Sequence, residues 1–117
     1  MTSIRIKRAY DAPADDDGMR ILVDRLWPRG LRRDRARIDL WLKDVAPSTE
    51  LRRWFGHDPA RWAVFQERYR AELADGKALE ALLEIVTQRP TVTLLFGAHD
   101  AQHNNARVLL PICEDRS

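Results

Sequence analysis

The chain has 117 residues, and 20 Lys and Arg residues against 18 Asp and Glu residues give it a formal net charge of +2. This length predicts one domain over residues 1–117, large enough to bury a core without a metal or disulfides. So small a net charge does not indicate nucleic-acid binding by bulk charge, and a single cysteine, Cys113, excludes an intrachain disulfide. The sequence has no long apolar run and no signal-peptide pattern, which predicts a soluble, cytoplasmic protein that does not enter a membrane.

The first half of the chain predicts two strands and a short helix. Residues 3–8 alternate apolar and basic side chains, which is typical of a half-exposed strand at or near a sheet edge. An aspartate-rich loop separates them from residues 19–23, a short apolar run that predicts a second strand, and Pro28 turns the chain soon afterwards. Apolar residues between positions 38 and 45 predict a short helix that ends before Pro47.

Two helices are predicted next, and both have clear start signals. Ser48 or Thr49 can cap a helix that ends at Gly56. Asp58 and Pro59 suit the start of a second helix. Its apolar residues recur with helical spacing and predict a stripe that faces the core: Trp62, Phe65, Tyr69 and Leu73.

The last third of the chain predicts a helix over residues 79–86, a buried strand over residues 91–96 and a final helix from about residue 102 to 110. Pro111 is expected to end that helix, which leaves a C-terminal tail from about residue 111. Strands near both ends with helices between them predict an α/β fold, a small three-layer sandwich with a short, largely parallel sheet. The helical segment between the second and last strands suits a crossover, so we expect the strands near Ile21 and Leu94 to be adjacent and parallel.

Parallel strands end at the same edge of a sheet, where open α/β sheets bind ligands. The segment that follows the second strand, from Arg25 to Arg29, is therefore expected near Gly97 and the start of the last helix. Two guanidinium groups beside a helix amino terminus favour an anion. The sequence thus predicts a basic, tryptophan-containing pocket for an anionic small molecule such as a nucleotide.

Six residues are predicted to bind this ligand: Arg25, Trp27, Arg29, Lys43, His103 and Asn104. Each has a structural alternative. The arginines can instead pair with Asp24, Asp34 or Asp44, and the indole can pack as a lid. The lysine can be solvated, and the histidine and asparagine can serve only the hydrogen bonding of the helix start.

The arginines between positions 20 and 37 support a different hypothesis: Arg20, Arg25, Arg29, Arg32, Arg33, Arg35 and Arg37. They can make loop 25–37 the phosphate-tracking strip of a nucleic-acid accessory module, with Trp27 stacking on a base. A third hypothesis is a protein-interaction domain anchored by exposed tryptophans.

No reaction can be assigned from catalytic motifs. His99 and His103 lie four residues apart, which permits metal ligation on a helix, but we expect His99 to precede the helix and predict neither a metal nor a cofactor. The sequence contains no Walker-type loop, no Gly-x-Gly-x-x-Gly and no convincing nucleophile arrangement, so catalytic residues are left unassigned.

Three blocks of sequence carry a resemblance to a known family: residues 23–30, residues 41–52, and residues 94–98 followed by 103–106. In their order and spacing, from about residue 4 to 110, the chain resembles the YeaO-like branch of the domain-of-unknown-function 488 family. The resemblance implies a small α/β fold with a pocket and no assigned activity. Many relatives are expected to carry serine where this chain has Gly97, and such a hydroxyl is missing here.

Overall fold

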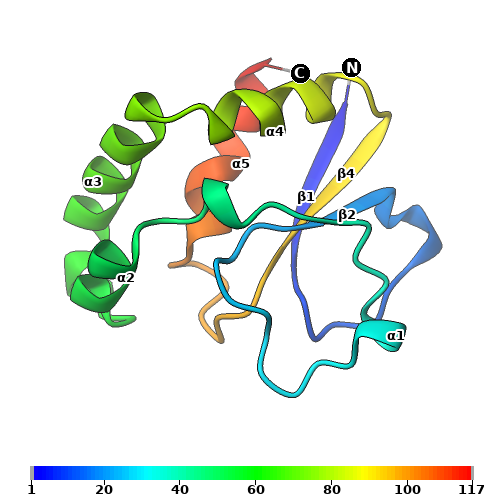
Figure 1. Ribbon diagram of the computed structural model, residues 1–117, viewed down its shortest axis with the longest axis horizontal. Coiled ribbons are helices and arrows are strands. Elements are labelled where there is room, and N and C mark those ends of the chain that lie inside the picture. Colours follow the sequence, from blue (N-terminus) through cyan, green and yellow to red (C-terminus); the bar gives the residue numbers. More distant parts are fainter. Residues whose placement is uncertain (1, 117) are drawn as a thin grey trace.

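The computed structural model describes residues 2–116, and its centre is a four-stranded parallel sheet (Figure 1). The strands are β1 (Ser3–Arg8), β2 (Met19–Leu22), β3 (Leu40–Trp41) and β4 (Thr91–Phe96). Their order across the sheet is β1-β4-β2-β3, so β1 lies at an edge as expected. Ile21 of β2 lies opposite Leu94 of β4 in a parallel pairing, which confirms the predicted adjacency of these strands.

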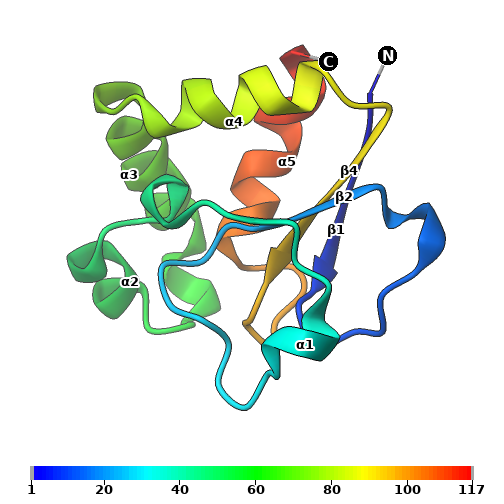
Figure 2. The same cartoon turned by 45° about the vertical axis from the view of Figure 1, so that its right-hand side comes forward.

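The structure has five α-helices within the described residues: α1 (Arg33–Ala36), α2 (Thr49–Phe55), α3 (Trp62–Asp75), α4 (Ala78–Thr87) and α5 (Asn105–Arg116). The four longer helices, α2 to α5, lie on one side of the sheet (Figure 1, Figure 2). The loop between β2 and β3, which contains α1, lies on the other side (Figure 2). The predicted α/β fold is confirmed, and its third layer consists mostly of loop.

A core lies on each face of the sheet because side chains alternate along the strands. Ile21 and Leu94 point toward the helices, where they join the large buried cluster that includes Tyr69 of α3. Leu22 and Leu95 point the other way. The partners of this second core are half-buried apolar residues of the loop and of β3: Trp27, Leu31, Ile38 and Trp41.

The predicted helix starts are confirmed at α2 and α3. Ser48 caps α2, because its Oγ accepts a hydrogen bond of 3.1 Å from the Leu51 amide. Asp58 accepts one of 3.0 Å from the Ala60 amide, and a 3-10 turn over Pro59–Arg61 leads into α3. The predicted stripe of α3 is confirmed, because its residues at positions 65, 69 and 73 are buried.

The prediction of a helix between residues 38 and 45 is wrong. Leu40–Trp41 forms β3, which pairs with β2, and a 3-10 turn over Lys43–Val45 follows. The sheet edge offers backbone partners to residues 40 and 41, as the bond of 2.9 Å from the Leu42 amide to the Leu22 carbonyl illustrates. So short a strand has no periodicity of its own to distinguish it from a helical turn.

The prediction that Pro111 ends the last helix is also wrong. The helix α5 starts at Asn105 and passes through Pro111 to Arg116, so the predicted tail is helical over its described residues. Its final turns carry Cys113, which is fully buried in the core. Proline removes one backbone hydrogen bond, and the burial of this helix face compensates for that loss.

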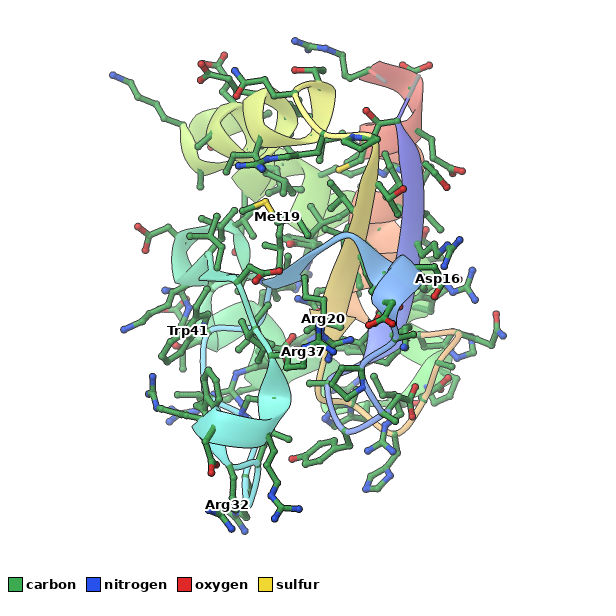
Figure 3. The ribbon with its side chains drawn as sticks, turned by 90° about the vertical axis from the view of Figure 1, so that its right-hand side faces the viewer. Asp16, Met19, Arg20, Arg32, Arg37 and Trp41 are labelled. Carbon is green, nitrogen blue, oxygen red and sulfur yellow. The ribbon has the colours of Figure 1, made fainter. Side chains whose placement is uncertain are left out.

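A buried ion cluster ties the loop face to the sheet. Arg20 is 3% exposed, and its guanidinium lies 2.6 Å from an Asp17 oxygen that also lies 3.0 Å from the Lys7 ammonium. The same guanidinium donates to the backbone carbonyls of Ala36 and Arg37 at 3.1 Å each. Figure 3 shows Arg20 beside Arg37 in the middle of this face. The cluster holds the C-terminal end of α1 against the sheet.

Candidate functional site

A pocket of about 1020 Å³ lies beyond the carboxyl ends of the strands, where the fold was expected to place a site. The segments that follow β1, β2 and β4 form one side of it, and α2, α3 and the start of α5 form the other. Its lining includes aromatic and aliphatic residues: Tyr10, Leu26, Trp27, Pro28, Phe55, Phe65 and Ala98. Its polar lining includes both signs of charge: Asp24, Arg25, Arg29, Arg52, His57, His99, Asp100 and His103.

The structure brings five of the six predicted ligand residues to this pocket: Arg25, Trp27, Arg29, His103 and Asn104. Lys43 lies elsewhere. Its ammonium is 4.3 Å from the centre of the Trp41 ring, and it lines a smaller hollow together with neighbouring residues of the segment 41–45 and with residues of α4. Lys43 is separated from the others because residues 40 and 41 join the sheet edge, and the chain then turns away in the 3-10 segment.

Arg25 is held by backbone carbonyls. Its Nε and Nη2 lie 3.4 Å from the Pro47 oxygen and 3.3 Å from the Ala46 oxygen, and it makes no ion pair with a carboxylate of residues 2–116. Arg29 is exposed at the rim, and its backbone carbonyl accepts a hydrogen bond of 2.7 Å from the Tyr10 hydroxyl. The structural network with aspartates, considered above as an alternative, is therefore not formed by these two side chains within the described chain.

Trp27 packs as part of the loop layer. Its indole N–H donates to the Leu31 carbonyl at 2.8 Å, and its ring meets the Trp41 ring edge-on with centroids 5.5 Å apart. The Arg33 guanidinium lies 4.3 Å from the centre of the Trp27 ring. The indole thus has partners for its N–H and for part of its surface, and it lines the pocket with the remainder.

His103 and Asn104 organise the start of α5. Asn104 accepts a hydrogen bond of 3.0 Å from the Arg107 amide and donates one of 2.9 Å to the Asp100 carbonyl, so it caps the helix. His103 Nδ1 lies 2.8 Å from Asp100 Oδ2. Hydrogen bonds from the Gln102 amide and the His103 ring hold the pKa of Asp100 below its usual value. Several amides that were expected to face an anion therefore already have acceptors within the loop.

Asp24 is a pocket residue that sequence reasoning considered only as a partner for arginine. It is half-buried, and its Oδ2 accepts a hydrogen bond of 2.8 Å from the Gly97 amide. Burial raises the pKa of Asp24 above its usual value, and the bonds from Gly97 and Asn105 oppose that rise. An acid directly after a buried strand is a signal that could have identified Asp24 in the sequence.

Arg52 and His57 also line the pocket. The sequence did not identify them as site residues, because they belong to α2 and the turn after it rather than to the segments that follow the strands. Gly56 and His57 both adopt left-handed backbone conformations, with φ of 54° and 58°. This conformation is uncommon for a residue with a side chain, and it turns the chain between α2 and α3. All three histidines of the chain, His57, His99 and His103, thereby reach one pocket. No pattern in the sequence indicates that convergence.

The pocket combines cationic, acidic and aromatic groups. The Phe55 and Phe65 rings in its wall stack with centroids 4.4 Å apart. Such walls can hold a planar group, and the arginines can hold an anion. Within residues 2–116 no cluster of three or more His, Cys, Asp or Glu side chains is arranged to hold a metal ion. None of the helices in that range is both long and apolar enough to cross a membrane.

Comparison with known proteins identifies the family. A family model described as "Inactive DUF488-N3 subclade" matches residues 3–117. The uncharacterised protein Rv3073c of Mycobacterium tuberculosis is 43% identical over 98% of this chain and 97% of its own length. The uncharacterised protein YeaO of Escherichia coli is 42% identical over 92% of this chain and 93% of its own. No solved structure matches significantly. The chain therefore belongs to the DUF488 family, in a branch with YeaO.

Proposed function

We propose that this protein binds an anionic small molecule of the nucleotide type in the pocket at the carboxyl edge of its sheet. The observation that carries the proposal is the convergence of Arg25, Arg29 and Arg52 on a pocket with stacked aromatic walls. Guanidinium groups bind phosphate and carboxylate through paired, charge-assisted hydrogen bonds, and a pocket of this size accommodates a drug-sized ligand. The expected compartment is the cytoplasm, which suits a chain with one cysteine.

Binding without a covalent step is the form of the proposal that the site favours. None of the described residues that line the pocket is a serine, threonine or cysteine. Gly97 offers only its amide, and the Ser48 hydroxyl outside the pocket is engaged with Glu72 at 2.6 Å. The word "inactive" in the description of the matching family model agrees with a binding role.

Ligand binding in the pocket is favoured over nucleic-acid binding and over protein interaction through tryptophans, because other side chains already contact arginines of the basic loop 25–37. Arg32, which projects from the loop in Figure 3, pairs with Asp34 at 2.9 Å, and Arg33 lies over Trp27. These contacts weaken the case for a continuous nucleic-acid strip. The case for tryptophan anchors is weakened as well, because the Arg68 guanidinium lies 4.4 Å from the Trp54 ring centre.

The test is ligand-induced stabilisation of the purified protein by inorganic phosphate and by ribose 5-phosphate, followed by calorimetric titration. Arg29→Gln and Arg25→Gln are each expected to raise Kd about 10- to 100-fold, the usual worth of a hydrogen bond to a charged group. The matched control is Arg35→Gln, which removes the same charge from an exposed position of α1 outside the pocket.

Failure of both phosphate and ribose 5-phosphate to bind would contradict the pocket proposal. So would equal weakening by the Arg29 and Arg35 substitutions with a steep dependence on salt, because a diffuse phosphate-tracking strip behaves in that way. The melting temperature of each variant without ligand checks its fold. Arg25→Gln needs this check most, since it loses the bonds to the Ala46 and Pro47 carbonyls.

A further inference from the structure

The negatively charged side chain of Asp24 is unexpected in a pocket that binds only anions. Asp24 lies two residues after the end of β2 and is held in the pocket wall by the amide of Gly97, the first residue after β4. It forms no ion pair with any residue between 2 and 116. A carboxylate at this position repels an anionic ligand unless the ligand also brings a hydrogen-bond donor to it.

The other side chains of the pocket indicate which chemical group of the ligand carries that hydrogen-bond donor. The pocket that Asp24 lines also contains the rings of Phe55 and Phe65 and the side chain of Ala98, and Pro28 lies beside Gly97, whose amide holds the carboxyl. The charge of Arg52 acts on Asp24 as well, without a direct ion pair. Aromatic and apolar side chains in the same pocket as a fixed carboxylate acceptor suit a flat ring that carries an N–H group in its plane. A carboxylate has about four lone-pair positions, so the bonds from Gly97 and Asn105 leave capacity for a donor from the ligand.

Asp100, the other acid of the pocket, has fewer free acceptor positions for a hydrogen bond from the ligand. Its Oδ1 accepts from the amides of Gln102 and His103, at 2.9 and 3.1 Å. Its Oδ2 lies 2.8 Å from the His103 ring. Both oxygens of Asp100 therefore serve the turn before α5, whereas the Asp24 carboxyl lies between the ends of two central strands.

We propose that Asp24 is a specificity-determining residue that accepts a hydrogen bond from a ring N–H of the ligand. The inference rests on the proposed function and narrows the ligand class to a phosphate ester joined to a planar nitrogen heterocycle with N–H donors. Guanosine monophosphate belongs to this class, because its base presents a ring N–H beside an amino group. Ribose 5-phosphate carries the same phosphate without the ring.

The experiment compares the binding of guanosine monophosphate and ribose 5-phosphate to three proteins by calorimetric titration. The unsubstituted protein is expected to bind the nucleotide at least 10-fold more tightly. Asp24→Asn replaces one carboxylate oxygen with a donor and is expected to remove that advantage, a loss of about 10- to 100-fold for the nucleotide. Its binding of ribose 5-phosphate should stay the same or tighten, because a negative charge is lost.

Asp100→Asn is the matched control, because it removes the same charge from the same pocket and keeps an oxygen for the turn. It should retain the preference for the nucleotide. Equal binding of the two ligands by the unsubstituted protein, or equal effects of the two substitutions, would overturn the role of Asp24 and leave the anion pocket standing. Failure of both ligands to bind the unsubstituted protein would overturn the proposed function as well. Binding of ribose 5-phosphate by Asp24→Asn shows that the variant is folded.

Discussion

Phe65 belongs to the core and to the pocket, so its replacement tests how the two are connected. The side chain is 2% exposed. Its ring stacks on Phe55 at 4.4 Å and on Trp62 at 5.6 Å, and it also meets Tyr69 at 5.7 Å between centroids. Phe65→Ala therefore removes a buried ring together with three aromatic contacts.

We expect Phe65→Ala to cost about 3 kcal/mol of unfolding free energy, the lower end of the range for buried phenylalanine. The lower end applies because one side of the ring borders the pocket, so solvent can enter part of the space that the ring leaves. A chain of this size should then melt on the order of 10 °C lower. Denaturant titration measures the free energy and calorimetry the melting temperature.

Val64→Ala is the control on the same helix. Val64 is 42% exposed, and its truncation should change stability by no more than about 0.5 kcal/mol. If Phe65→Ala cost as little as Val64→Ala, the aromatic wall would not be part of the core. Such a result would show that α3 does not support the pocket wall.

Two further predictions concern the acids beside the sheet. Buried Arg20→Leu should cost about 3 to 5 kcal/mol, because Asp17 keeps its charge and loses a partner. Burial acts to raise the pKa of Asp17, but hydrogen bonds from the Ala14 amide, Lys7 and Arg20 together hold it below the usual 3.8. Its contribution to stability is thus complete above about pH 4 and lost as pH falls further, and acid titration of Arg20→Leu should show unfolding that begins at higher pH. Gly97→Ala places a Cβ 3.1 Å from Asp24 Oδ2, so the carboxyl must shift and its bond to the amide should lengthen. Carboxyl NMR titration should then show a further rise in the pKa of Asp24, and an unchanged pKa would contradict this reasoning.

The sheet could be predicted from the sequence where its signals were local. Residues 19–23 and 91–96 are apolar runs bounded by turns, which predicts two strands. The helical segment between them implies a right-handed crossover, so the parallel pairing of these strands could be predicted as well. The two residues of β3 could not be predicted, because their structure depends on the edge offered by β2. The end of α5 was misplaced because burial of Cys113 depends on tertiary packing that no local rule for proline includes.

The candidate site was predictable only in the part that follows from sheet topology. Arg25 and Arg29 lie after a strand, and the edge rule placed them correctly beside the segment that follows β4. Arg52 lies within α2 and His57 lies two residues after it, and their convergence with Arg25 and Arg29 depends on how α2 and α3 pack. Lys43 was expected in the pocket and lies outside it, because the path of the chain after β3 depends on how residues 40 and 41 join the sheet edge.

The elements that shape the pocket are held by contacts that do not involve a ligand. The aromatic wall belongs to the core through Phe65, and the basic loop is tied down by Arg20 and its bonds to the carbonyls before β3. The turn at His57 is fixed between two helices, and the start of α5 is capped by Asn104. A pocket that is formed before its ligand arrives requires little reorganisation on binding, and most of the binding energy then remains available for recognition. Selectivity in such a site depends on which polar groups point into it, so under the proposed function the Asp24 carboxyl is expected to discriminate between ligands that share a phosphate.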